Sequence, residues 1–197
     1  MRDTKMSKLK KFEIFMDNLS SLKEISKDDS NKLDILYMTE SSLEVINFDG
    51  VKKKYINSLG LSEDNASSVD GILEVGGRVV FIEFKNGKMK NEKRKVKDKI
   101  RDSLLMFCDI TDSQICDTRE QVEFVLVYNK EKNPVHNHAV PEDMQESHSR
   151  LEIAKYFSKK ANKEFIRFDL EKFKKLYFKD VHTYSEEEFK DYIERYY

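Results

Sequence analysis

The sequence is poor in the residues and segments that mark secreted, fibrous and membrane proteins. Its 197 residues include two cysteines, two prolines, six glycines and no tryptophan. Two cysteines provide neither a disulfide framework nor a zinc site built mainly on thiolates. No apolar run approaches the roughly 20 residues of a membrane-spanning helix, and the first residues contain no apolar segment of the signal-peptide kind. We therefore expect a cytoplasmic protein with reduced thiols and without a membrane partner.

Charged residues are abundant, and the two signs are nearly balanced. Lysine and arginine number 36 and aspartate and glutamate 37, so the formal net charge is −1. The hydrophobic fraction is 39%, and because aromatic and aliphatic residues recur along the chain, the composition is that of a folded protein. A chain of this length can bury a sizeable core. We expect a single domain over residues 1–197 that carries local charged blocks.

Hydrophobic periodicity predicts an α/β domain with a mixed central sheet flanked by helices. Apolar residues at helical spacing indicate a first helix from about Ser7 to Ile25. Strands are expected at 43–48, 69–75, 78–85 and 122–128, and further helices at 51–59 and after Gly87. A strand, a helix and a strand in this order favour a right-handed crossover, which makes strands 78–85 and 122–128 parallel.

The carboxyl-terminal part is expected to extend a core of about residues 40–130. The pattern predicts a helix at 144–161, a strand at 165–170 and a helix at 171–178. Ser185 and Glu188 form a capping-box pair at the start of a last helix. The apolar face of that helix is expected to bury Phe189, Tyr192, Ile193 and Tyr196.

One hairpin has the most informative spacing in the sequence. Gly76-Gly77 separates two strand-like segments, and a glycine pair suits a two-residue turn because both residues can adopt positive φ. If the residues that flank the glycines pair, every further pair has the same index sum, so Asp70 lies opposite Glu83. Lys85 shares their face because side chains alternate along a strand. The hairpin thus gathers two carboxylates and an ammonium group at the end away from its turn.

These three side chains have the chemistry of a hydrolase. Two facing carboxylates repel, and a hard cation such as Mg²⁺ would offset the repulsion while activating a water molecule. The ammonium of Lys85 would orient that water or neutralise charge on a phosphate. The simpler alternative is a solvated hairpin face on which all three are ordinary surface charges. Against it, Ile72, Val79 and Phe81 make the middle of the same face apolar.

Asp70, then twelve residues, then Glu83-Phe84-Lys85 resembles the motif of the PD-(D/E)xK nucleases, the restriction-endonuclease-like superfamily. The resemblance covers roughly residues 65–130. It implies a restriction-endonuclease-like core in which Asp70, Glu83 and the backbone carbonyl of Phe84 bind Mg²⁺ or Mn²⁺ and Lys85 is the catalytic lysine. It also implies hydrolysis of phosphodiester bonds in DNA, or less favourably RNA, in restriction, defence or repair.

The family pattern leaves three points open in this sequence. Val69 stands where the family name has proline. Members of the family often use an additional glutamate from an upstream helix, and the candidates are Glu24, Glu40 and Glu44. Many nucleases with this core cut duplexes as symmetric dimers, so a homodimer or a partner subunit is a further expectation, although the sequence identifies no dimer face.

A basic block follows the hairpin directly. Residues 85–101 contain nine lysines and arginines and two acidic residues, a net charge of +7. Such a block can neutralise backbone phosphates with an affinity that falls steeply with salt, and a solvated helix face is the simpler alternative. The residues expected to contact nucleic acid are Lys88, Lys90, Lys93, Arg94, Lys95, Lys97 and Arg101.

A second hypothesis assigns the same fold to a protein without catalytic activity. Under this hypothesis the chain is a non-catalytic nucleic-acid- or protein-binding protein, such as an immunity or regulatory subunit, that uses the basic helix. The intact set of Asp70, Glu83 and Lys85 favours the enzyme, because a protein that only binds has no reason to keep all three.

Overall fold

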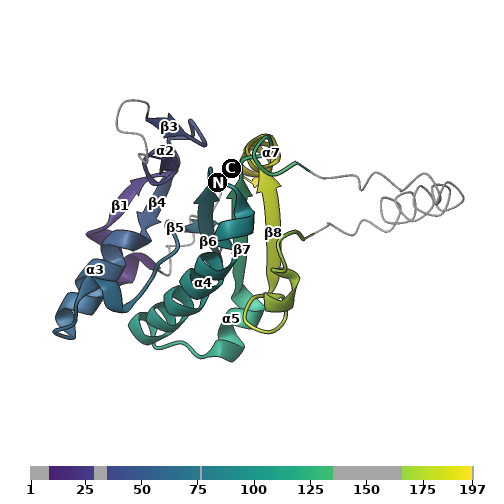
Figure 1. The fold of residues 1–197 in the computed structure, drawn as a ribbon. Helices are drawn as coiled ribbons and strands as arrows, with labels where there is room; N and C mark the ends of the chain where they lie inside the picture. Colours follow the sequence, from purple (N-terminus) through teal and green to yellow (C-terminus); the bar gives the residue numbers. More distant parts are fainter. Residues whose placement is uncertain (1–8, 29–34, 76, 135–165, 197) are drawn as a thin grey trace, which may run out of the picture.

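The computed structural model describes residues 9–28, 35–75, 77–134 and 166–196. The strands of its main sheet are β1 (Leu19–Ser21), β4 (Glu44–Asn47), β5 (Gly71–Val75), β6 (Arg78–Lys85), β7 (Val122–Tyr128) and β8 (Asp180–Ser185). They lie side by side in the order β1-β4-β5-β6-β7-β8 (Figure 1). Neighbours are antiparallel from β1 to β6, and β7 runs parallel to both β6 and β8. The predicted α/β class with a mixed central sheet is therefore confirmed.

Helices lie on both faces of this sheet (Figure 1). The α-helices are α1 (Glu13–Met16), α2 (Leu22–Ile25), α3 (Phe48–Ser58), α4 (Met89–Thr111), α5 (Ile115–Gln121) and α7 (Glu186–Tyr196). Short 3-10 turns are η1 (Leu9–Lys11), η2 (Glu63–Asn65) and η4 (Glu171–Phe173), and a small second sheet pairs β2 (Lys27–Asp28) with β3 (Leu36–Tyr37). α3 and α4 cover one face of the main sheet, and α7 packs against the other.

Side chains of β6 alternate between two separate apolar clusters. Phe81 belongs to the first, where its ring lies 6.0 Å from that of Phe48 in α3 and 5.3 Å from that of Phe107 in α4. Phe84 belongs to the second, and its ring lies 5.6 Å from that of Phe189 in α7. Because successive side chains of a strand point to opposite faces, this one strand ties the two helical layers together.

The hairpin has the register that the glycine pair predicts. Val75 pairs with Arg78, and Gly71 pairs with Ile82. Gly77 has a φ of 82°, a left-handed value that glycine adopts readily. The strand expected at 69–75 begins only at Gly71, so Asp70 directly precedes β5 and the paired residues end with Gly71 and Ile82. As expected, β6 and β7 are parallel and a helix, α4, lies in their connection, followed by α5.

The single helix predicted from Ser7 to Ile25 is wrong as a continuous element, because its described part consists of the short helical segments η1, α1 and α2, with a strand between the last two. α1 ends at Met16, and Leu19–Ser21 forms β1, which pairs with β4. The carbonyl oxygen of Asn18 accepts the N–H of Asn47 at 2.8 Å, so the pairing begins directly after the helix ends. Backbone pairing with a neighbouring strand thus outweighs the helical spacing of the apolar side chains.

Two predictions near the carboxyl terminus are also wrong. The strand expected at 165–170 does not form over its described part, because Phe168 and Asp169 have φ values of 63° and 61°, which no strand adopts. The helix expected at 171–178 is reduced to η4, and Lys175 has a φ of 62°. The sixth strand is instead β8, which the sequence analysis did not predict.

The last helix begins as expected. The N–H of Ser185 donates to Glu188 Oε2 at 2.7 Å, and the N–H of Glu188 donates to Ser185 Oγ at 3.3 Å, which completes the capping box. α7 buries three of its four predicted apolar residues, whereas Tyr196 is 43% exposed. The helix expected at 144–161 lies outside the described residues. Within the described ranges, no helix combines the length and the apolar character that crossing a membrane requires.

Candidate active site

Hydrogen bonds to two helices fix the backbone on either side of Asp70. The N–H of Val69 donates to Ser103 Oγ of α4 at 2.8 Å, and Ser103 is fully buried. The N–H of Phe48, the first residue of α3, donates to the carbonyl oxygen of Asp70 at 3.1 Å. These two hydrogen bonds hold the backbone at Asp70, directly before β5, against both α3 and α4.

The last residues of β6 extend past Gly71, the first residue of β5, and this extension forms the floor of the site. Ile82 lies opposite Gly71, the first residue of β5, and β6 continues to Lys85. There the N–H of Phe84 donates to Asp70 Oδ2 at 2.6 Å. The N–H and C=O groups of one strand residue point to the same neighbouring strand, so the carbonyl of Phe84 faces the side on which Asp70 lies.

The two carboxylates are brought together with two lysines. Glu83 is fully buried, and its Oε1 lies 2.9 Å from Lys85 Nζ and 2.8 Å from Lys99 Nζ. Lys99 Nζ also lies 3.1 Å from Asp70 Oδ1. The structure thus brings together the three predicted residues and adds Lys99 of α4, which the sequence analysis counted only as part of the basic block.

Burial and mutual repulsion perturb the charges of this cluster. Burial and then the Glu83 carboxylate raise the pKa of Asp70 to about 7, although Lys99, the N–H of Phe84 and Lys85 act in the opposite direction. Burial alone would lower the pKa of Lys99, but the carboxylates of Glu83 and Asp70 outweigh it, and the pKa is raised. Lys99 therefore carries its charge at any physiological pH, while Asp70 titrates near neutrality.

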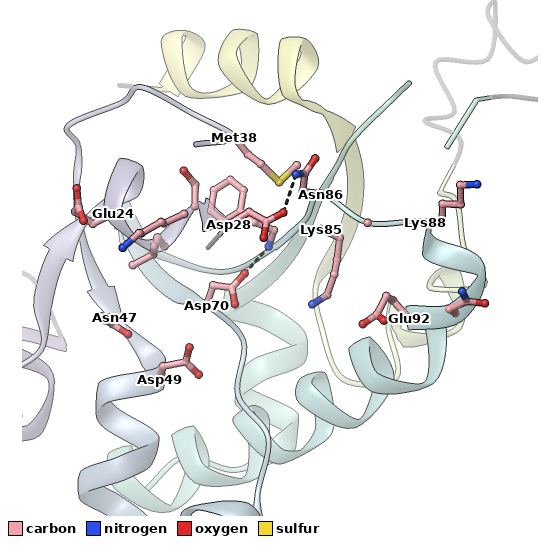
Figure 2. Close-up of a pocket in the computed structure, with 16 residues that line it drawn as sticks. Glu24, Asp28, Met38, Asn47, Asp49, Asp70, Lys85, Asn86, Lys88 and Glu92 are labelled. Atoms are coloured by element: carbon pink, nitrogen blue, oxygen red, sulfur yellow. Dashed lines mark hydrogen bonds between the residues drawn. The ribbon is translucent and has the colours of Figure 1, made fainter. Parts of the chain in front are cut away.

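A cleft of about 790 Å³ opens in front of Asp70 and Lys85. Figure 2 shows Asp49 and Glu24 on one side of it and Lys88 and Glu92 on the other. The charged residues that line the cleft are Glu24, Lys27, Asp28, Asp49, Asp70, Lys85, Lys88 and Glu92. The cleft is thus rich in carboxylates, with lysines at its floor and along its rim.

The three upstream glutamates occupy different places. Glu24 lines the cleft, whereas Glu40 pairs with Lys23 at 2.6 Å and Glu44 pairs with Lys10 at 3.1 Å, and neither of these two is among the residues that line the cleft. Of the three candidates, Glu24 is the one that reaches the cleft. Asp49 of α3 also faces the cleft, and the sequence analysis missed it because nothing in its local spacing relates it to the hairpin.

The basic block begins at the end of β6 and continues into the first half of α4, and its basic side chains point in several directions. Lys93 and Lys97 lie 3.1 and 3.8 Å from Asp169, so both face the loop before η4. Arg94 and Arg101 both lie near Asp98, at 3.9 and 3.4 Å, on the exposed side of the helix. Lys95 lies 3.5 Å from Glu92, Lys90 is exposed, and Lys88 lines the cleft. The seven predicted contacts therefore form a band around the first half of α4.

The donor atoms at the site suit a hard divalent cation. The Asp70 and Glu83 carboxylates and the Phe84 carbonyl are oxygen ligands of the kind that Mg²⁺ and Mn²⁺ prefer. Among the residues that the structure describes, no group of three or more His, Cys, Asp and Glu side chains is placed to hold a metal ion. A cation at this site would take its remaining ligands from water and phosphate, which is usual for Mg²⁺.

No family model, curated protein or solved structure matches the chain. The functional assignment therefore depends on the geometry and chemistry of the cleft.

Proposed function

We propose that the chain is a metal-dependent nuclease with a PD-(D/E)xK-type core, and that it hydrolyses phosphodiester bonds of DNA in preference to RNA. One observation carries the proposal. Asp70, directly before β5, and Lys85 of β6 line an open cleft, and the buried Glu83 lies behind them, 2.9 Å from Lys85 Nζ and joined to Asp70 through Lys99. Two carboxylates and a lysine in this arrangement have the groups that phosphodiester hydrolysis needs.

Each residue has a defined task in this proposal. Asp70, Glu83 and the carbonyl of Phe84 would hold Mg²⁺ or Mn²⁺. When bound, such a cation neutralises charge on the phosphate and lowers the pKa of a coordinated water. Lys85, whose side chain is 18% exposed, is positioned by its ion pair with Glu83 to orient the attacking water or to stabilise the negative charge of the transition state.

The first turns of α4 supply the proposed nucleic-acid contacts. Lys88 lines the cleft next to Lys85, and Lys90, Arg94 and Arg101 are exposed further along the helix. Phosphates that reach the cleft would pass this band of positive charge, so affinity should fall as salt concentration rises. A role in restriction, defence or repair, in the cytoplasm, alone or with a second subunit, is consistent with such an activity.

Cleavage assays test the proposal directly. The purified chain is incubated with linear, circular and single-stranded DNA and with RNA, in Mg²⁺ or Mn²⁺ and in EDTA. We expect metal-dependent cleavage in the wild type and a rate lower by about 10²-fold or more in Lys85→Ala. Lys172→Ala is the matched control, because it removes the same charge from η4, outside the residues that line the cleft. Full activity in Lys85→Ala would refute the assignment.

A non-catalytic binding protein is the second candidate, and one observation favours it. Lys99 and Lys85 form ion pairs with Asp70 and Glu83, and such a cluster also meets the requirements of a purely structural ion-pair network. Calorimetry separates the two candidates. A nuclease should bind Mn²⁺ more weakly when Asp70 is replaced by Asn, whereas a structural network predicts no metal binding at this site in either protein.

A further inference from the structure

Lys99 occupies a specific point between the two carboxylates. Its Nζ lies 3.1 Å from Asp70 Oδ1, 2.8 Å from Glu83 Oε1 and 3.1 Å from Glu83 Oε2. A lysine ammonium has three N–H donors, and here three carboxylate oxygens lie within their reach. A cation that bridges Asp70 and Glu83 has to lie between these same oxygens, so the ammonium and the metal would use the same space.

The charges at the site also indicate that the ammonium of Lys99 and a divalent cation cannot occupy it together. When both carboxylates are ionised, Lys85 and Lys99 already balance them with two positive charges. Bringing a divalent ion into this cluster while Lys99 stays would place two cations within a few ångströms of each other. Such a contact is strongly repulsive in a partly buried site, where the effective dielectric constant is low.

Lys99 is also able to leave. Its side chain is 21% exposed, whereas that of Glu83 is completely buried. Lysine carries its charge on a flexible stem of four carbons, so the ammonium can reach water, where hydration replaces its contacts with the two carboxylates. Val96, Ile100 and Ser103 fix the buried face of α4 around it, so the side chain can move without displacement of the helix.

On the basis of the proposed function, we propose that Lys99 holds Asp70 and Glu83 together in the metal-free protein and competes with the divalent cation for them. Metal binding then requires the ammonium to withdraw from the carboxylates. Lys99 thereby sets the metal concentration at which the site is loaded, and it prevents the buried carboxylates from repelling each other before loading.

Titration calorimetry with Mn²⁺ alone tests the competition. Lys99→Met keeps the length of the side chain and removes its charge, so we expect Mn²⁺ to bind at least about tenfold more tightly than to the wild type. Lys99→Arg keeps the charge and should not show the gain. Lys172→Met removes the same charge from an exposed position in η4, outside the residues that line the cleft, and should leave the affinity unchanged. An affinity of Lys99→Met equal to or below that of the wild type would overturn the inference, as would a lack of binding to both.

A second measurement uses the wild type alone and does not depend on how well Lys99→Met folds. Acetylation with limiting acetic anhydride, followed by mass spectrometry, reports the accessibility of each lysine. Addition of Mn²⁺ should increase labelling of Lys99 several-fold and leave that of Lys95 unchanged. Unchanged labelling of Lys99 at saturating Mn²⁺ would contradict withdrawal of the ammonium.

The results also separate this inference from the proposed nuclease activity. Tighter Mn²⁺ binding to Lys99→Met without cleavage of any nucleic acid by wild type or variant would support the competition and refute the nuclease. Metal-dependent cleavage that is lost in Lys85→Ala, together with unchanged Mn²⁺ affinity in Lys99→Met, would support the nuclease and refute the competition.

Discussion

Ionisation of Asp70 lowers the stability of the folded protein. Its pKa is raised to about 7 in the folded protein, from an ordinary value of 3.8. Between these two pH values the folded protein binds a proton that the unfolded chain has released, so stability falls as pH rises from about 4 to about 7. A carboxyl group in a favourable salt bridge would have the opposite effect, because its pKa would be lowered.

Replacement of Asp70 by Asn should therefore flatten the pH dependence of stability. We expect the free energy of unfolding of the wild type in EDTA to fall between pH 5 and pH 8 by about 2 to 3 kcal/mol relative to that of Asp70→Asn. Urea denaturation at several pH values measures the difference. Asp98→Asn, at an exposed position on α4, should follow the wild type. Parallel curves for wild type and Asp70→Asn would mean that Asp70 is ionised throughout this range.

At the scale of single residues, the sequence predicted the part of the site that local spacing determines. Asp70, Glu83 and Lys85 belong to one hairpin, and its register follows from the position of two glycines. Lys99 contacts both carboxylates from a different element, and its place depends on how α4 is rotated about its axis. Val96 and Ser103, one turn before and after it, are both buried, and this spacing was the signal that could have identified Lys99.

At the scale of helices and strands, the sequence predicted the elements whose pattern lies within a few neighbouring residues. It did not predict the strands that depend on pairing with another strand. The β5–β6 turn and the capping box of α7 are encoded by residues within a few positions of one another. β1 has three residues and exists because β4 pairs with it, and β8 is an outer strand that β7 alone holds in the main sheet. β1 is too short to show an alternation, and β8 alternates in burial but has the polar residues Thr183 and Ser185 at two of its three buried positions. Neither strand therefore has the apolar alternation by which a strand is predicted.

The capping box makes a measurable contribution to α7. Ser185→Ala removes the Oγ that accepts the N–H of Glu188, and we expect a loss of about 1 kcal/mol in the free energy of unfolding. Chemical denaturation measures this loss, and Lys190→Ala, at an exposed position on the same helix, is the control. Because Phe189 packs on Phe84, a change in the near-ultraviolet circular dichroism of the aromatic rings should accompany it. A stability equal to that of the control would show that the cap contributes nothing.

At the scale of the whole molecule, one aromatic residue joins three segments of the chain on one face of the main sheet. Phe81 is completely buried, and its ring lies near Phe48 of α3, Phe107 of α4 and Phe178, which follows η4. The chain order predicted the mixed sheet, because a strand, helix and strand sequence forces a parallel pair. It did not predict that residues after η4 return to the same core, since that contact joins segments about one hundred positions apart.

Phe81→Ala should consequently destabilise the whole fold in one step. We expect a loss of about 3 to 5 kcal/mol in the free energy of unfolding, which is typical of a large aromatic side chain removed from a packed core. Urea denaturation followed by both fluorescence and circular dichroism tests whether the transition stays cooperative. Leu105→Ala, at a position 63% exposed on α4, should cost less than about 0.5 kcal/mol. Similar losses in both variants would mean that the aromatic cluster is not the centre of the core.

The unequal lengths of β5 and β6 make the site more sensitive than the fold to changes in the hairpin loop. β5 has five residues and β6 has eight. A slip of one residue between them would exchange side chains between the two apolar clusters, whereas a slip of two would keep each side chain on its face. The same slip of two would carry Asp70 away from Phe84 and place other backbone groups against it. The exact pairing of β5 with β6 is therefore required by the carboxylates more strictly than by the alternation of side chains between the two faces.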